Sequence, residues 1–181
     1  RYHAVSGRPF VDGVFVPNGA NGPVTVDSLG HLCSEFPKTA NATWQAIWAG
    51  NHFDKDPTTI DDVDYASNGR GLIYLNGNSA VTFNLDAVRH ANPNCTIAQF
   101  CAVAANMCSD NNFYADIWVL IDGKKQFLRR QVNNHSRGFW VRIPIHDNDH
   151  FLTLAATDGG DGIHLDLVAF GDPRLELLPN E

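Results

Sequence analysis

The sequence lacks the features that would assign it to a functional class at once. No apolar run approaches the roughly 18 residues that cross a membrane, and no signal peptide opens the chain. Because the first residue is Arg1 rather than Met, we expect a processed or excised piece of a longer polypeptide. The motifs of nucleophile-elbow hydrolases, zinc proteases, phosphate loops and cupins are absent. These absences favour a protein that is not an enzyme.

Basic residues are also scarce. The 13 Lys and Arg residues face 20 Asp and Glu residues, which gives a formal net charge of -7. An acidic chain repels nucleic acid and anionic membranes, which argues against both as partners, whereas a neutral ligand such as a sugar is compatible. Only 18% of the residues are charged and 15 are Gly, a balance that favours short strands joined by polar turns. The 181 residues suit a single domain.

The cysteines follow no common zinc-binding pattern. There are four, Cys33, Cys95, Cys101 and Cys108, an even set that allows three disulfide pairings. Glycosylation sequons begin at Asn41, Asn94 and Asn134. Together these two signals favour an extracytoplasmic protein, whether secreted, periplasmic or at the cell surface. Buried free thiols in a cytosolic protein are the alternative.

Short β-type runs recur along the chain. Near the end, runs at 151–155 and 163–170 flank the acidic Gly-rich turn 158–162, and a last strand, 174–178, follows Pro173, which cannot continue a ladder. Other strands are expected at 24–28, 30–36, 72–75, 79–85, 113–121, 124–132 and 138–145. Periodicity leaves residues 97–105 open between a strand and a helix, and the neighbouring strands favour a strand. About ten strands, with turn signals roughly every 8 to 12 residues, predict an all-β sandwich of two sheets.

Three segments lie outside this regular pattern. Residues 10–17 are expected to form a tight hairpin around Asp12-Gly13. Residues 38–71 are expected to form a long surface loop, the kind of segment that often carries function. Residues 86–90 predict one helical turn, which Pro93 follows.

Three blocks of sequence resemble, in order, the NPCBM-like family of carbohydrate-binding modules. They are VTFNLDAVR at 81–89, ADIWVLIDGK at 115–124, and TDGGDG at 157–162 followed by DPRL at 172–175. The resemblance covers residues 72–177 and implies a jelly-roll, galactose-binding-like sandwich with long loops and one or two short helical turns. We expect one domain, 1–181, in which residues 1–71 supply N-terminal strands and a long loop and residues 72–178 form the module-like core.

Sugar recognition needs an aromatic face to stack on a pyranose and polar side chains to take its hydroxyl groups. The candidate ligand-binding residues are Trp44, Gln45, Trp48, Asn51, His52, Tyr114 and His135. Loops of a sandwich gather at its two ends, so these residues can share one rim. The alternative for each tryptophan is that it plugs the core beneath its loop. Trp118 and Trp140 lie within apolar strands and are expected in the core.

Two acidic stretches have the oxygen-rich character of a calcium site. In the first, Asp158, Asp161 and Asp166 are candidate ligands together with backbone carbonyl groups, which makes structural calcium the one cofactor considered. The second runs from Asp54 to Asp64 and contains five carboxylates. For both, the alternative is a solvated acidic turn, because Asp and Gly are the residues that such turns accept.

The sequence therefore predicts a non-catalytic module that binds carbohydrate and serves a larger secreted or surface polypeptide, whose other domains are its further partners. A structural or adhesive sandwich that mediates protein contacts or self-assembly is the first alternative. A small lyase or hydrolase on the same fold is the second, since glycosidase carboxylate pairs come from distant strands. The strand motifs of jelly-roll polysaccharide lyases are absent.

Overall fold

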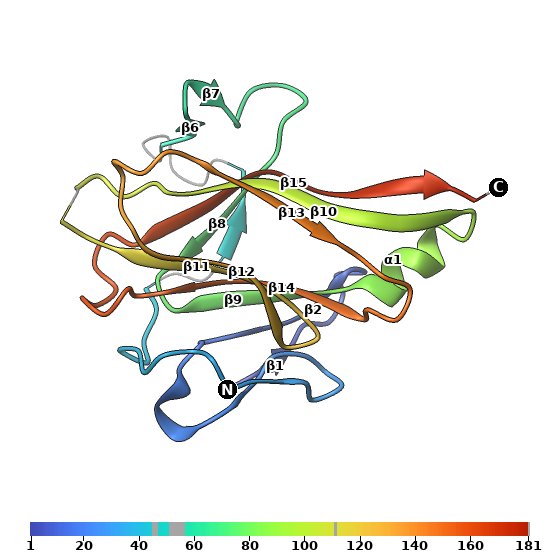
Figure 1. Ribbon diagram of the computed structural model, residues 1–181, viewed down its shortest axis with the longest axis horizontal. Coiled ribbons are helices and arrows are strands. Elements are labelled where there is room, and N and C mark those ends of the chain that lie inside the picture. The colour runs from blue at the N-terminus through green and yellow to red at the C-terminus, as the bar shows by residue number, and fades with distance from the viewer. Residues whose placement is uncertain (45–46, 51–56, 111, 181) are drawn as a thin grey trace.

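Two antiparallel sheets face each other across one apolar core (Figure 1). The computed structural model describes residues 1–44, 47–50, 57–110 and 112–180. The first sheet has the order β1 (His3–Ala4), β2 (Val11–Phe15), β9 (Ser79–Asn84), β14 (Phe151–Thr157), β11 (Ala115–Ile121) and β12 (Lys124–Val132). The second has the order β13 (Phe139–Pro144), β10 (Cys95–Asn106), β15 (Leu167–Pro179), β8 (Leu72–Asn76) and β5 (Ile47–Ala49). The predicted all-β sandwich is confirmed.

Smaller elements decorate the two sheets. They are the 3₁₀ turn η1 (Gly19–Asn21), the helix α1 (Leu85–Ala91), the pair β3 (Val24–Thr25) and β4 (Leu32–Cys33), and the pair β6 (Thr59–Ile60) and β7 (Val63–Asp64). The Asn84 side chain caps α1 by accepting from the Ala87 N–H at 2.8 Å, as Asn often does at a helix start. The predicted helical turn is therefore confirmed. None of the described helices has the length and apolar character needed to cross a bilayer.

Strand β11 is buried on both faces. Ile117, Val119 and Ile121 face the core between the sheets, while Trp118 and Leu120 face a second apolar cluster formed with the N-terminal segment. Burying one such side chain contributes about 1.5–3 kcal/mol. The Trp118 indole N–H donates to Thr157 Oγ1 at 3.0 Å, so its polar atom is satisfied as well. The expectation that Trp118 lies in the core is confirmed.

Segments from the first 71 residues cover parts of the outer faces of both sheets. On the first sheet, Val26 and Phe36 are buried, and the Phe36 ring meets the Trp118 ring edge-on at 5.1 Å. On the second sheet, Ile60 and Tyr65 from the β6–β7 segment pack with Tyr74 and Val103. The stretch expected to be one long loop thus contains three short strands, and β5 extends the second sheet by pairing with β8.

Two expectations about turns are wrong. Residues 10–17 form no hairpin, since β2 runs straight through Asp12-Gly13 and pairs with β9. Gly13 is needed for another reason: a Cβ there would lie 2.3 Å from the ring of Tyr2, which packs against it.

Pro173 does not end a strand either. Strand β15 continues to Pro179, because the β10 register steps from Val103 opposite Gly171 to Cys101 opposite Arg174. This register shift leaves Asp172 and Pro173 in a bulge, where a missing donor breaks no ladder bond. Residues 163–166, expected to open this strand, lie before it in a bend, a turn and irregular backbone.

The four cysteines are free thiols, so the expected disulfide framework is not present. Cys33 packs in the cluster around Trp118, Cys101 lies on the outer face of β10, and Cys108 follows β10 and donates to the Asp110 carbonyl at 3.0 Å. Burial raises the pKa of each of these three thiols, which keeps them protonated and unreactive. They are small apolar side chains of the fold.

Candidate functional site

One end of the sandwich, which we call the loop pole, gathers loops that are far apart in the sequence. Strands β2, β10, β12 and β14 end there, and β9, β11, β13 and β15 begin there. The loop pole consequently contains residues 16–18, 39–44, 77–78, 107–110, 112–114, 133–138 and 158–166. It lies at the left in Figure 1, opposite α1 and the C-terminus.

Asp158 holds three of these loops together. Its carboxylate is buried and accepts from the Ala40 N–H at 2.7 Å, the Asn78 side-chain amide at 2.9 Å and the Gly160 N–H at 3.2 Å. In return, the Asp158 N–H donates to the Asn78 side-chain oxygen at 3.0 Å. Buried hydrogen bonds to a charged acceptor are stronger than neutral ones, so Asp158 fixes where residues 39–44 run.

Asp161 ties a further loop to the same turn. Its carboxylate accepts from the Tyr114 N–H at 3.1 Å, and the rings of Phe113 and His164 meet edge-on at 5.0 Å. Gly159 makes the approach possible: it has a φ of +57°, and a Cβ there would lie 2.4 Å from the Tyr114 carbonyl oxygen. Tyr114, half-buried, is thereby brought to the loop pole together with residues 39–44.

Asp166 is the unusual member of this acidic group. It is 1% exposed, and neither carboxylate oxygen has a hydrogen-bond partner among the described residues. Burial, followed by the negative charges of Asp161, Asp158 and Asp116, raises the pKa of Asp166 to about 8. Asp166 therefore keeps its proton at neutral pH.

The structure places the three candidate calcium ligands in one turn but gives them different tasks. Asp158 and Asp161 already accept backbone N–H groups. In the described part of the chain, the one set of three metal-ligating groups whose ligand atoms lie within 4.8 Å of one another is Asp27, His31 and Asp122 instead. Calcium at Asp158, Asp161 and Asp166 stays a prediction.

The Asp27, His31 and Asp122 group lies away from the loop pole and is internally satisfied. Asp27 accepts from the His31 ring at 2.8 Å and from the His31 N–H at 3.1 Å. Asp122 accepts from the backbone N–H groups of His150 and Phe151. These contacts close two turns, so a structural role accounts for the group.

The two loop tryptophans differ sharply. Trp44 is 80% exposed and stands at the loop pole, three residues after Asn41. Trp48 is half-buried in β5, where its indole stacks on the Tyr74 ring at 5.1 Å and 27°. Trp44 thus presents an open aromatic face, whereas Trp48 packs against the outer side of the second sheet.

The remaining candidates divide between described and undescribed residues. His135 is exposed in the turn between β12 and β13, where its backbone N–H donates to the side-chain oxygen of Asn133 at 3.2 Å. Gln45, Asn51 and His52 lie outside the described residues, as do Asp54 and Asp56 of the second acidic stretch.

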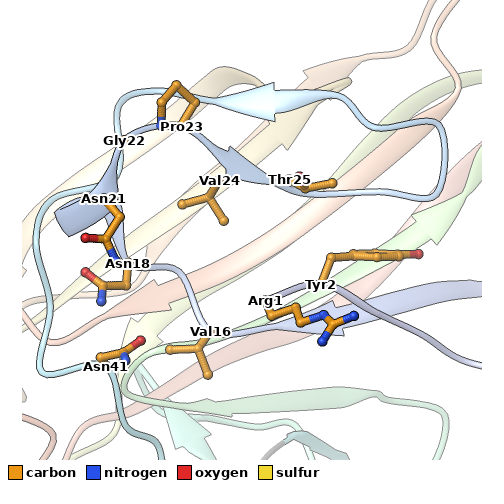
Figure 2. Close-up of a pocket in the computed structure, with 10 residues that line it drawn as sticks. All are labelled: Arg1, Tyr2, Val16, Asn18, Asn21, Gly22, Pro23, Val24, Thr25 and Asn41. Carbon is orange, nitrogen blue, oxygen red and sulfur yellow. The ribbon is translucent and has the colours of Figure 1, made fainter.

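A cavity of about 480 Å³ opens beside residue 41 (Figure 2). Its lining residues are Arg1, Tyr2, Val16, Asn18, Asn21, Gly22, Pro23, Val24, Thr25 and Asn41. Figure 2 shows the three asparagine side chains on one side of the hollow and Arg1 with Tyr2 on the other. A smaller hollow of about 210 Å³ shares Arg1, Val16 and Asn41 and reaches Thr43, next to Trp44.

Asn18 fixes the shape of this cavity. Its side-chain oxygen accepts from the Ala20 N–H at 3.0 Å and from the Thr39 N–H at 3.1 Å, which ties the η1 turn to the chain leading to Trp44. The cavity is not evident from the sequence, because Asn18, Asn21 and Asn41 look like ordinary turn residues until the fold brings them together. Their one sequence signal is the asparagine content of the segment between β2 and β5.

The expectation that Trp140 lies in the core is wrong. Trp140 is 67% exposed, whereas its neighbours Val141 and Ile143 are buried. The alternation in β13 gives the reason: Phe139, Val141 and Ile143 face inward, so Trp140 and Arg142 face outward. A period-two reading of FWVRIPI would have found it.

The architecture is that of galactose-binding-like sandwiches, the fold of carbohydrate-binding modules of the CBM51 kind. The family model described as the NPCBM/NEW2 domain matches residues 31–176, and the chain therefore belongs to the NPCBM/NEW2 family of carbohydrate-binding modules. The resemblance seen in the sequence is confirmed. No curated protein sequence matches the chain.

Solved structures similar to this chain include CBM51 modules from Clostridium perfringens. The CBM51 of GH95 from Clostridium perfringens, in complex with methyl-galactose, has a TM-score of 0.54 and 15% identity over 97% of this chain and 92% of that chain. CBM51-2 with the INT domains of Clostridium perfringens ZmpB, in complex with GlcNAc, has a TM-score of 0.53 and 14% identity over 99% of this chain and 39% of that chain. A structure of the M60 catalytic domain of Clostridium perfringens ZmpB with its CBM51-1 and CBM51-2 domains has a TM-score of 0.54 and 19% identity over 91% of this chain and 19% of that chain.

Proposed function

We propose that the loop pole is the carbohydrate-binding site of this module, with the Trp44 indole as its stacking surface. The observation that carries the proposal is an open tryptophan beside an asparagine-lined hollow. An indole face packs on the C–H side of a pyranose, while amide groups donate to and accept from its hydroxyl groups. Both requirements of sugar recognition meet around Asn41.

The ligand class we propose is a neutral terminal hexose or N-acetylhexosamine. Structures of the same fold hold methyl-galactose and GlcNAc. In this chain the carboxylates of Asp158 and Asp161 are occupied by backbone N–H groups, so amides are the groups left to meet the sugar. Tyr114 and His135 flank the same pole and extend the surface for a second sugar unit.

We further propose that the module is non-catalytic and forms one domain with its N-terminal strands. The pole carboxylates act as scaffold, since Asp158 and Asp161 orient loops and Asp166 is buried and protonated. A secreted or surface polypeptide with further domains fits this role, and a solved relative of the fold carries a catalytic domain beside two such modules. Asn41, at the start of a sequon, is part of the proposed site, so the site requires it unglycosylated.

A glycan array tests the proposal. Wild type and the variants Trp44→Ala, Asn41→Ala and Trp48→Phe would be compared on neutral glycans. We expect Trp44→Ala to lose at least about tenfold in affinity, as for loss of one well-packed aromatic contact, and Trp48→Phe to retain binding.

Three outcomes would reject the proposal. Wild-type protein that binds no glycan but self-associates in light scattering would favour the adhesive sandwich. Release of reducing ends from polysaccharide would favour an enzyme. Full binding by Trp44→Ala would place the site elsewhere.

A further inference from the structure

The outer face of the second sheet carries a patch that the loop pole does not explain. We call it the outer platform and define it as Gln99, Trp140, Arg142, Arg174 and Glu176. Trp140 is 67% exposed on the edge strand β13, and Arg142 and Arg174 are exposed as well. Exposed tryptophan beside arginine is typical of a binding surface.

Strand register arranges these residues as a grid. Cys101 on β10 lies opposite Arg142 on β13 and opposite Arg174 on β15, so two arginines flank one small buried side chain. Trp140 lies one row away, opposite Val103. Gln99 lies in the row on the other side, opposite Glu176.

Residues opposite one another in a ladder point to the same side of the sheet. Three strands and three rows span about 10 by 13 Å. The grid therefore spans an area about the size of a disaccharide, and the bulge at Asp172 and Pro173 lies beside it on β15.

Contacts within the outer platform hold its groups in place. The Arg142 guanidinium lies 5.7 Å from the centroid of the Trp140 ring, a cation–π distance that orients both groups. Glu176 accepts from the Gln99 amide at 2.5 Å and from Arg174 at 3.1 Å. Because these side chains already hold one another in place, they lose little conformational entropy when a ligand binds.

Charge points to the class of ligand. The chain as a whole carries -7, yet the outer platform has two guanidinium groups against one carboxylate. Among the described residues no carboxylate forms an ion pair with Arg142, whereas Arg174 is paired with Glu176. A guanidinium of this kind binds carboxylate or sulfate through two parallel hydrogen bonds.

We infer that the outer platform is a second saccharide-binding surface, selective for a sugar that carries a carboxylate or sulfate group. The pyranose ring stacks on Trp140, its anionic group pairs with Arg142, and Gln99 with Glu176 receives a neighbouring hydroxyl. This surface is separate from the loop pole and does not depend on it. A module with both surfaces would hold a branched or acidic glycan at two points, which raises avidity.

Titration calorimetry with three matched probes tests the inference: lactose, sialyllactose and sulfated lactose. Wild type is expected to bind the two anionic probes at least about tenfold more tightly than lactose at this surface, and less tightly as salt rises, because exposed charges are screened. Comparison of the two anionic probes shows whether carboxylate or sulfate is preferred.

Variants separate the two surfaces. Trp140→Ala and Arg142→Gln should each lose about tenfold or more for the anionic probes, while Trp140→Phe should retain most of the binding. Both positions are exposed, and melting curves would confirm that the variants fold. Trp44→Ala should leave anionic binding intact, and Trp140→Ala should leave neutral-glycan binding at the loop pole intact.

Equal affinity of wild type for all three probes would overturn the inference, as would anionic binding that survives both Trp140→Ala and Arg142→Gln. Loss of anionic binding only in Trp44→Ala would assign it to the loop pole instead. Self-association that Trp140→Ala abolishes, with no anionic sugar bound, would show the surface to be a protein contact.

Discussion

The pKa of Asp166 predicts an unusual dependence of stability on pH. Its folded-state pKa is about 8, whereas an Asp in an unfolded chain has a pKa near 3.9. Between these values the folded protein holds a proton that the unfolded chain releases. Stability contributed by this group is therefore greatest at low pH and falls as pH rises, by about 1.4 kcal/mol per unit. From pH 5 to pH 7 the loss is about 3 kcal/mol, and above pH 8 it levels off.

Asp166→Asn removes this dependence. Asparagine has nearly the same shape as aspartate and cannot ionise. The variant should therefore be more stable than wild type at pH 7, and this advantage over wild type should be smaller at pH 5. Urea unfolding at pH 5, 6 and 7 measures the difference, with exposed Asp62→Asn as the matched control that should follow wild type. Parallel pH curves for wild type and Asp166→Asn would refute the assigned pKa.

The same experiment tests calcium. A bound cation would ionise Asp166 and stabilise the folded state according to its concentration and affinity. If calcium binds at Asp158, Asp161 and Asp166, calcium chloride should raise the unfolding midpoint of wild type, EDTA should lower it, and Asp166→Asn should respond to neither. Equal midpoints of wild type in calcium and in EDTA would reject the predicted site.

Three further predictions concern the scaffold. Gly159→Ala should destabilise the fold by about 2 kcal/mol or more, because an αL alanine is strained and its Cβ would meet the Tyr114 carbonyl. Gly160→Ala, also at positive φ but in open space, should destabilise the fold less. Equal losses of stability in urea unfolding would contradict this difference. The hydrogen bond and charge of Asp86 raise the pKa of His150. The pair therefore stabilises the fold fully below the ordinary His pKa, and this stabilisation is lost as pH rises through the raised pKa of His150. Asp86→Asn should lower the His150 pKa in an NMR titration, and an unchanged pKa would contradict the pairing. Alkylation in denaturant without reductant should label all four cysteines, and fewer labels would reveal a disulfide.

The fold was largely predictable because its signals are local. The alternation in 79–85 and the Asp122-Gly123 turn signal require only neighbouring residues, and the structure has β9 at the first and the turn between β11 and β12 at the second, as the sequence predicted. Pro173 gave a wrong prediction of a strand end, because the missing N–H donor of a proline breaks a ladder hydrogen bond only where the strand is regular. The bulge opposite β10 is a tertiary feature that no local pattern reveals.

The candidate site was predictable only in part. Trp44 stands at the loop pole because Asp158 captures the Ala40 N–H across 118 residues of sequence, a contact that composition cannot indicate. Trp48 and Trp44 look equivalent in sequence, yet one has the Tyr74 ring beneath it. Cysteine number suggested disulfides, although all four cysteines are free thiols and three of them are buried as small apolar side chains.

The central claim is that a sugar stacks on Trp44 at the loop pole. The most direct test is an NMR titration of the four indole N–H signals, assigned with single Trp→Phe variants, using a neutral glycan identified on the array. The Trp44 signal should shift in a saturable way while that of Trp118, buried and bonded to Thr157, stays fixed. A titration in which the Trp44 signal stays still, or in which only the Trp140 signal moves, would contradict the account.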